Sequence, residues 1–413
     1  MFRQGALAFL DQAFFAGANF FVNVLLARWL LPEDYGDFVT LYTLMLFVGV
    51  FHSALVVDPF LVLGAGKFYP RYADYFRFAV RFHRHMLAAT VVCALALAWA
   101  VAEFTTLETG VGVAATILAW SLIATLWFLR RCCYLVDRLA AAVRAMAVYF
   151  FGLLALIALF QFAGRLTVTT AFVCFVVAAA VAAYYLYTAL RAGAATTVVA
   201  AADITVMADH WRLGSWGLAT QLLSWVPGNI YFVVLPLVAD DVANAELKAL
   251  ATLTMPVLHV ISVIVTLCLP RLVRARGTAE FDRLLKSALA LCAVLAVINW
   301  LLLGIFGEFF ISLLYRGQYA DQSHLLWLIG IAPMFSVVIA LIGAALRALE
   351  NNRALFFVNV VAAGVSVTVG VALMYMWHTE GAAVGWVLTS ILSSVLLWRV
   401  FNREMQARPA IVR

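Results

Sequence analysis

Residues 287–314, SALALCAVLAVINWLLLGIFGEFFISLL, decide the fold, because Glu308 is the one charged residue in the whole stretch. Basic residues stand on both sides, with Arg283 and Lys286 before the stretch and Arg316 after it. A helix that crosses a bilayer needs about 20 consecutive apolar residues, whereas a strand of a membrane barrel shows about 10 residues of alternating polarity. This run is continuous and does not alternate, so it predicts a transmembrane helix.

The composition extends this prediction to the whole chain of 413 residues. Hydrophobic residues make up 66% of it and charged residues 12%, and the mean hydropathy is +1.02. A soluble domain has about 45–50% apolar and about 25% charged residues, so one soluble core cannot bury this excess. No polar stretch is long enough for a soluble catalytic domain of about 100 residues. For the net charge of +6, what matters is therefore how the charged residues are divided between the two sides of a membrane, and we expect no nucleic-acid partner.

Apolar runs separated by charged and turn-rich breaks predict about twelve transmembrane helices in an all-α polytopic membrane protein. They lie near residues 5–31, 38–63, 86–102, 110–130, 146–163, 166–190, 214–238, 249–270, 287–314, 324–348, 354–377 and 382–400. An Ala- and Thr-rich break in the middle divides them into two six-helix bundles. The predicted parts are an N-terminal bundle, a cytoplasmic linker, a C-terminal bundle and a cytoplasmic tail, at 1–190, 191–213, 214–400 and 401–413.

The basic residues give the orientation. When the twelve spans alternate across the membrane, all but four of the 27 Lys and Arg residues fall on one side, the exceptions being Arg28, Arg165, Lys248 and Arg316. Loops on the cytoplasmic side of membrane proteins carry an excess of Lys and Arg. We therefore expect both termini to be cytoplasmic.

The first span carries an unusual number of polar side chains. Gln12, Asn19 and Asn23 fall on one face of the predicted helix, where they either line a wet cavity or bind a neighbouring helix through amide hydrogen bonds. Both interpretations stay open. Arg28 lies one turn from the end of the span, where it either contacts a substrate or extends to the membrane interface.

Two carboxylates inside predicted spans are candidates for ion coupling. Asp11 lies in the first span, and Asp58 precedes Pro59 in the second, which also carries His52. An ionisable group inside a span is costly and usually faces a cavity or a partner. A proline removes a backbone donor and disturbs the helix. The second span therefore holds either a hinge with a cation or proton site, or a kink whose polar groups are satisfied.

A weak internal repeat links the two halves. Asp11 stands eight residues before Asn19 in the first span, and Gln221 stands eight residues before Asn229 in the seventh. Coincidence is the alternative, because few polar residues are available. If the repeat is real, Gln221 and Asn229 line the same cavity from the second bundle, as repeated bundles do in transporters.

Catalytic and metal-binding signatures are absent from the sequence. It contains no P-loop, no HExxH, no GxSxG and no dinucleotide fingerprint, and its extracytoplasmic loops are predicted to be short. The six cysteines show neither a CxxC spacing nor an interleaving with histidine, which predicts no metal site and no cofactor. The sequence favours a transporter over an enzyme.

Several stretches together resemble a known family. They are 10–19, which opens with Leu-Asp-Gln and ends at Asn19; 25–36, LLARWLLPEDYG; 54–64, ALVVDPFLVLG; and the weaker echoes 130–138, RRCCYLVDR, and 345–349, ALRAL. In this cadence the chain is similar to bacterial polysaccharide flippases, the polysaccharide-transport branch of the multidrug/oligosaccharidyl-lipid/polysaccharide (MOP) exporter superfamily.

The resemblance implies a V-shaped pair of six-helix bundles in the bacterial cytoplasmic (inner) membrane, opening alternately to each side. It implies a polyprenyl-diphosphate-linked oligosaccharide as substrate, in the biosynthesis of O-antigen, capsule or exopolysaccharide. Coupling to a Na⁺ or H⁺ gradient, and association with polysaccharide polymerase or assembly proteins, are further implications. The alternatives are a cation-coupled multidrug exporter of the same superfamily and, less well supported, a membrane glycosyltransferase or polymerase.

One departure limits the inference about the diphosphate. Lipid II flippases of the superfamily carry arginines deeper in the first span, where this chain has Ala16 and Val22. Arginine binds phosphate in bidentate fashion, so other arginines must serve. Besides Arg28, the candidates for holding the diphosphate are Arg130, Arg131 and Arg347.

Overall fold

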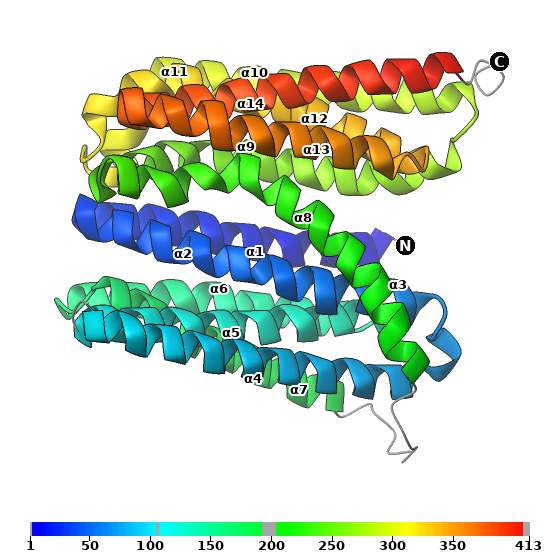
Figure 1. Ribbon diagram of the computed structural model, residues 1–413, viewed down its shortest axis with the longest axis horizontal. Coiled ribbons are helices and arrows are strands. Elements are labelled where there is room, and N and C mark those ends of the chain that lie inside the picture. The colour runs from blue at the N-terminus through cyan, green and yellow to red at the C-terminus, as the bar shows by residue number, and fades with distance from the viewer. Residues whose placement is uncertain (1, 105–106, 192–203, 408–413) are drawn as a thin grey trace. The chain divides into compact units, whose positions relative to one another are not determined.

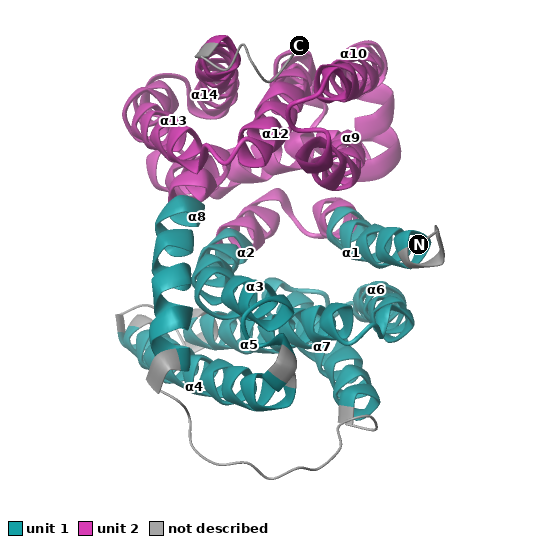
Figure 2. Ribbon diagram, turned by 90° about the vertical axis from the view of Figure 1, so that its right-hand side faces the viewer, with its two compact units in different colours: residues 1–22, 41–222 teal, residues 23–40, 223–413 magenta. Residues whose placement is uncertain are grey.

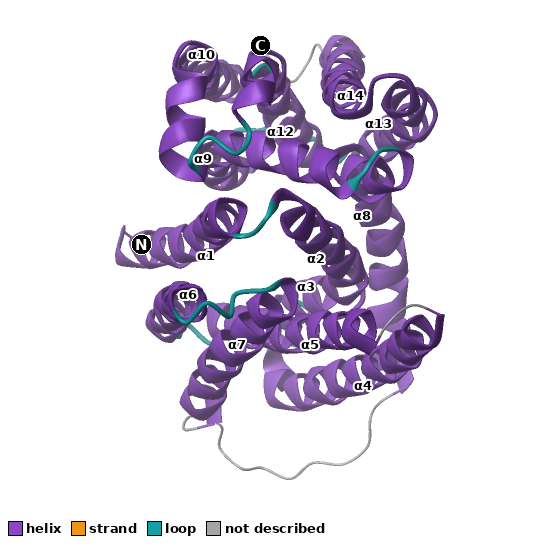
Figure 3. Cartoon of the chain, turned by 90° about the vertical axis from the view of Figure 1, so that its left-hand side faces the viewer, coloured by secondary structure: helices purple, strands orange, loops and turns teal. Residues whose placement is uncertain are grey.

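The computed structural model describes residues 2–104, 107–191 and 204–407, and over these ranges it contains helices and turns but no strand (Figure 3). Eleven helical segments of the described chain are long and apolar enough to cross a membrane. The longest, at 352–406, has 55 residues and is interrupted at Trp377 and His378, where the backbone leaves helical geometry and His378 has a φ of 44°. It therefore provides two spans, and the prediction of about twelve transmembrane helices is confirmed.

The chain divides into two compact units (Figure 2). Unit 1 comprises Met1–Val22 and Leu41–Leu222, and unit 2 comprises Asn23–Thr40 and Leu223–Arg413. The division differs from the predicted bundles in that 23–40 groups with the second half of the chain. Of the predicted linker at 191–213, residues 192–203 lie outside the described residues, and the part from Ile204 onward is helical. The limits of the predicted bundles stay a prediction.

Unit 1 is built around α5, which packs against α3, α4, α6 and α7; the long helices α4, α5, α6 and α7 run side by side in Figure 1. Its elements are α1 (Phe2–Trp29, as far as Val22), α2 (Pro32–His52, from Leu41), a π-helical turn (Ser53–Val57), α3 (Asp58–Ala65), a 3-10 turn (Tyr69–Arg71), α4 (Tyr72–Phe104), α5 (Leu107–Leu135), α6 (Leu139–Phe162), α7 (Val168–Arg191) and the first part of α8 (Ile204–Val238). Its fully buried side chains include Phe60, Phe128, Met146, Leu153 and Phe172. These apolar rings and branched chains fill the space between the helices.

The junction of α2 and α3 is irregular because of its sequence. The backbone N–H of Asp58 donates to the carbonyl of Ser53, five residues earlier, which is the π-helical spacing. Pro59 has no N–H to donate to the carbonyl of Leu55. That carbonyl instead accepts a hydrogen bond from His210 Nε2 of α8, at 2.8 Å. The proline-disturbed helix predicted here is present, and its freed carbonyl has a partner.

Unit 2 is built around α12, which packs against α9, α10 and α14. Its further elements are α9 (Asp241–Arg274), α10 (Ala279–Tyr315), a 3-10 turn (Ala320–Leu325), α11 (Leu326–Ile329), α12 (Ala332–Ala348), α13 (Asn352–Val365), a π-helical turn (Ser366–Gly370) and α14 (Val371–Ala407). Side chains start two of these helices: Asp240 accepts from the N–H of Ala243, and Asn351 from that of Ala354. The buried core includes Ile261, Leu285, Cys292, Leu341, Ile342 and Leu346.

Candidate functional site

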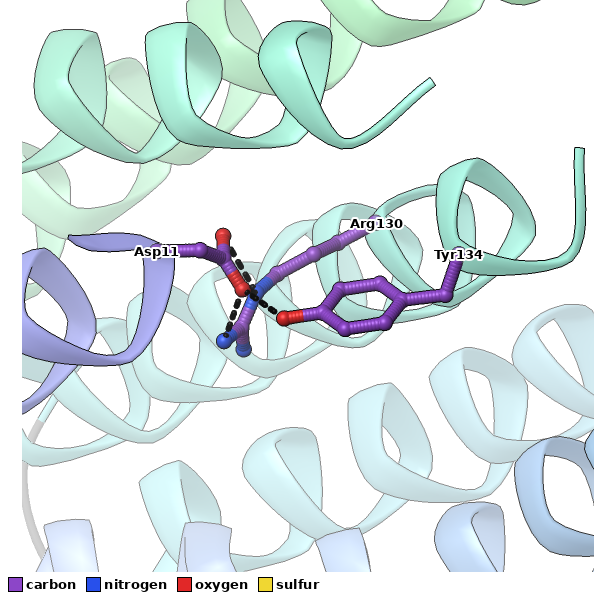
Figure 4. A network of polar contacts seen from close by, with 3 residues as sticks. All are labelled: Asp11, Arg130 and Tyr134. Carbon is purple, nitrogen blue, oxygen red and sulfur yellow. Dashed lines mark hydrogen bonds and ion pairs between the residues drawn. The ribbon is translucent and has the colours of Figure 1, made fainter. Parts of the chain in front are cut away.

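A buried ion pair joins α1 to α5 inside unit 1 (Figure 4). Asp11 has no exposed surface, and Arg130 is 3% exposed. Arg130 Nε lies 2.9 Å and 2.7 Å from the two carboxylate oxygens of Asp11, and its Nη2 lies 2.6 Å from Oδ2. The Tyr134 hydroxyl donates to the same Oδ2 at 2.5 Å. The carboxylate therefore receives a two-point charged contact and a hydroxyl hydrogen bond away from water.

Local sequence explains this geometry. Arg130 and Tyr134 stand four residues apart on α5 and so share one face of the helix. The Arg130 guanidinium also lies over the ring of Phe15, 5.1 Å from its centroid, so an aromatic face covers the cation. Arg131 lies over the Tyr134 ring at 5.5 Å. Removing one partner of such a buried pair typically costs about 3–5 kcal/mol, because the other charge is left without compensation.

The structure thus brings together two residues for which separate roles were predicted. Asp11 was predicted to couple an ion, and Arg130 to hold a diphosphate. In this conformation each is the partner of the other, and neither has surface available to a ligand. Arg131, the neighbouring diphosphate candidate, is half-buried and interacts electrostatically with both Asp11 and Asp58.

That second carboxylate binds a predicted cavity residue. Gln221 Nε2 of α8 donates to Asp58 Oδ2 of α3 at 2.6 Å, within unit 1. The Asp58 side chain is exposed at the protein surface, whereas Gln221 is half-buried. An exposed carboxylate inside a span is tolerated where it meets water and is costly where it meets lipid. Asp58 and Gln221 thus form a polar contact at the exposed surface of unit 1.

The two asparagines of the first span each bind a tyrosine of α2. In unit 1, the Tyr42 hydroxyl donates to Asn19 Oδ1 at 2.8 Å. In unit 2, the Tyr35 hydroxyl donates to Asn23 Oδ1 at 3.2 Å. Both amides thus hold α1 against α2, and Asn23 is almost fully buried. Of the two interpretations left open by the sequence, this geometry favours helix packing, while cavity lining stays a prediction.

Arg28 and Arg347 occupy different environments in unit 2. Arg28 Nη1 donates to the carbonyls of Leu313 and Leu314, at 2.6 Å and 3.2 Å, in the last turn of α10. A cation there satisfies carbonyls that have no partner within the helix and complements the helix dipole. Arg347, near the end of α12, is exposed. Of these two diphosphate candidates, Arg347 is the more accessible.

The remaining candidates are less connected. Gln12 is half-buried on α1. Asn229, in the part of α8 that belongs to unit 2, donates from Nδ2 to the carbonyl of Trp225 in its own helix, at 2.9 Å. Among these side chains the structure brings together Gln221 with Asp58 and Asp11 with Arg130. Tyr134 was not among the predicted site residues, although its four-residue spacing from Arg130 was a usable signal.

The fold defines the class of protein to which the chain is similar: its helices superpose on transporters of the MOP superfamily. One is a multidrug resistance MATE family transporter in an inward-facing conformation, with a TM-score of 0.78, 11% identity, and coverage of 95% of this chain and 94% of that one. Another is the lipid II flippase MurJ in an inward closed conformation, with a TM-score of 0.78, 12% identity, and coverage of 97% and 88%. A third is a MOP superfamily transporter from Pyrococcus furiosus, described as having a binding pocket of reversed polarity. It gives a TM-score of 0.68 and 10% identity, with coverage of 98% of this chain and 95% of that one.

At these identities the likeness establishes the fold and leaves the substrate open. No protein-family model matches the sequence, and no curated protein matches it. The all-α polytopic fold expected from the sequence is confirmed as that of MOP transporters. The expected polysaccharide branch belongs with the proposals.

Proposed function

We propose that the protein is a membrane transporter that translocates a polyprenyl-diphosphate-linked oligosaccharide across the bacterial inner membrane by alternating access. The observation that carries the proposal is the buried pair of Asp11 and Arg130, with Arg131 beside it. A buried arginine needs an anionic partner, and guanidinium groups bind phosphate oxygens in bidentate fashion. The similarity of 25–36 and 54–64 to polysaccharide flippases supports the same substrate class.

The pair suggests how binding of the substrate and binding of a coupling ion would be linked. In the conformation described here Asp11 neutralises Arg130. A diphosphate that binds Arg130 and Arg131 must displace the Asp11 carboxylate, which then needs a proton or Na⁺ to remain in an apolar surrounding. Ion and substrate would therefore favour the same rearranged state, and each would raise the affinity for the other. This exchange unites the predicted roles of Asp11 and Arg130 in one step.

The oligosaccharide headgroup would need polar partners during transit. Gln12, Gln221 and Asn229 are half-buried amides on α1 and α8 and would serve as hydrogen-bonding groups. Asp58 would provide a second site for the coupling ion, at the exposed position where it binds Gln221. The cytoplasmic placement of both termini, and any association with a polysaccharide polymerase, are part of this proposal.

The test is deletion of the gene in its host, followed by analysis of lipid-linked intermediates on each leaflet. Flipping predicts that the complete oligosaccharide lipid accumulates on the cytoplasmic leaflet. Complementation with the Arg130→Lys variant tests the site, because lysine keeps the charge and loses the bidentate geometry. The matched control is Arg138→Lys, since Arg138 donates to the backbone carbonyl of Ala189 and lies outside the proposed site. Shortened sugars, or an unpolymerised product on the outer side, would contradict the proposal and indicate an enzyme.

A multidrug exporter is the second candidate, because the MATE family transporter fits this chain with the same TM-score as MurJ. A buried carboxylate such as Asp11 also suits exchange of a cationic drug for an ion. The two candidates differ in phenotype. Deletion of a drug exporter sensitises cells to cationic drugs and leaves the lipid-linked sugars unchanged, whereas deletion of a flippase does the reverse.

A further inference from the structure

A second polar cluster lies inside unit 1 and has no part in the proposed transport site. His52, at the end of α2, and His83, in α4, are 1% and 4% exposed. His52 Nε2 and His83 Nδ1 are 2.9 Å apart, which is a hydrogen bond between two imidazoles. Polar residues are rare inside spans because their desolvation is costly. A directly bonded pair of histidines at such a place requires an explanation.

The hydrogen bonds around the pair fix where the protons are. The Thr125 hydroxyl donates to the carbonyl of Ser121 at 2.8 Å, so its single proton is used there. Thr125 Oγ1 can therefore only accept from His83 Nε2, 3.3 Å away. His83 then carries its proton on Nε2, and its Nδ1 must accept the proton of His52 Nε2. A neutral His52 with its proton on Nε2 has a bare lone pair on Nδ1.

That last nitrogen has no donor among the residues that the structure describes. Beside it, the Trp120 ring stands perpendicular to the His52 ring with their centroids 6.2 Å apart. Trp120 Nε1 is a donor and is also buried without an acceptor in the described part of the chain. The chain of hydrogen bonds from Ser121 to His52 thus ends in a basic nitrogen that is free to bind a proton.

We propose that His52 Nδ1 is a proton-binding site and that the histidine pair acts as a pH-sensitive switch. A proton that binds Nδ1 converts His52 to an imidazolium, and the proton on Nε2 can then move to His83 Nδ1. No bond other than N–H forms or breaks, and one positive charge is gained. The His83 ring is stacked on Phe128, 4.7 Å between centroids and 16° between planes, so an aromatic face receives that charge.

The charge has a consequence for conformation. A buried charge without a counter-ion costs several kcal/mol, so the protonated pair disfavours the dry packing described here. His52 is followed directly by the π-helical turn Ser53–Val57, where the helical hydrogen bonding is already irregular. Protonation would favour a state in which this turn opens and water reaches the imidazoles. The switch acts on the junction of α2 and α3.

Other titratable groups on the surrounding elements are engaged elsewhere. His210 of α8 binds the carbonyl of Leu55, Asp58 of α3 binds Gln221, and Arg130 of α5 binds Asp11. Within the described residues, none of these makes a hydrogen bond or an ion pair with either imidazole. The pair therefore titrates as a unit of its own. The inference stands whether the substrate is a lipid-linked sugar or a drug.

The direct test is nitrogen NMR of the full-length protein in lipid nanodiscs, with ¹⁵N-labelled histidine. At about pH 8 the proposal predicts a neutral His52 with a bare Nδ1 and a neutral His83 with its proton on Nε2. As the pH is lowered from about 8 to about 3, the Nδ1 resonance should move to the imidazolium position, and it should do so at a lower pH than an exposed histidine because burial disfavours the charged form. His52→Gln and His83→Gln assign the signals. An Nδ1 that stays bare over this whole range, or the opposite tautomers, overturns the proposal.

Deuterium exchange of the backbone at 53–58 supplies a second measurement that needs no substrate. After correction for intrinsic rates, we expect wild-type exchange to increase at least several-fold as the pH falls. His52→Gln keeps an N–H donor toward His83 but cannot take a proton, so its exchange should not change with pH. His85→Gln is the matched control, because His85 is exposed on α4, the helix that also carries His83. This variant should behave like wild type. Equal pH dependence in wild type and His52→Gln would show that the pair is a fixed structural contact.

Discussion

The ion pair between Asp11 and Arg130 makes a quantitative prediction about stability. Replacing Arg130 by Met leaves a carboxylate with no exposed surface and the Tyr134 hydroxyl as its one remaining hydrogen-bond donor in the cluster. Replacing Asp11 by Leu leaves a guanidinium that is 3% exposed. Each single change should lower the free energy of unfolding by about 3–5 kcal/mol, because the surviving charge loses its partner in an apolar surrounding.

The double variant Asp11→Leu with Arg130→Met should recover most of this loss. Both charges are then gone and the replacements are apolar, a change that is often neutral or stabilising when the volumes fit. The coupling energy of the cycle should therefore approach the sum of the two single effects. Arg131→Met is the control, because the Arg131 side chain is only half-buried. It should cost clearly less than Arg130→Met.

The assay is reversible denaturation of the purified protein in mixed micelles, with the free energy of unfolding compared among the four members of the cycle. If the two single losses simply add in the double variant, Asp11 and Arg130 do not interact, and the geometry of Figure 4 is wrong. A single variant with wild-type stability would be equally damaging. Transport measured on the double variant then separates roles: normal stability without transport indicates that the charges themselves are needed.

Three further substitutions test other contacts. His210→Phe leaves the carbonyl of Leu55 without its side-chain donor and should lower the free energy of unfolding by about 1–3 kcal/mol. The backbone amides that follow Leu55 should also exchange with deuterium faster. Tyr42→Phe removes the hydroxyl that binds Asn19 and should lower the free energy of unfolding by about 0.5–1.5 kcal/mol. Transport should change little if the Asn19 amide only packs α1 against α2. A loss of transport without loss of stability would favour cavity lining by Asn19. Arg28→Met should cost about 1.5–3 kcal/mol by freeing two carbonyls at the end of α10, and unchanged stability would show that the contact is dispensable.

Much of the fold was predictable because transmembrane helices are set by local composition. The apolar run at 287–314 lies inside α10, and the predicted break between the last two spans coincides with the interruption at Trp377 and His378. Each span is recognised from its own residues, since the bilayer fixes its length and polarity. The grouping of 23–40 with the second half of the chain was not predictable, because it depends on tertiary contacts that no local pattern encodes.

The candidate site was predicted as a set of residues but not as a set of contacts. The rarity of polar residues in spans singled out Asp11, Asp58 and Gln221, and the structure shows the contacts that these residues make. That Asp11 meets Arg130 could not be foreseen, because the two residues lie on helices far apart in sequence and each had several possible partners. The histidine pair was not predicted: His52 was noted only with Asp58 and Pro59 of the second span, and no local pattern shows its hydrogen bond with His83.

Translocation of a lipid-linked oligosaccharide can be measured with the purified protein in reconstituted liposomes. Liposomes containing polyprenyl-diphosphate-linked oligosaccharide would be made with and without the purified protein, and the sugar accessible to a membrane-impermeant glycosidase would be measured over time. We expect the wild-type protein to make nearly all of the lipid accessible to the glycosidase. With the Arg130→Lys variant, the lipid of the inner leaflet should stay protected from the enzyme. If the inner-leaflet lipid stays inaccessible while the same wild-type protein exports a cationic drug from these liposomes, the protein does not translocate the lipid-linked oligosaccharide, and the proposed function is wrong.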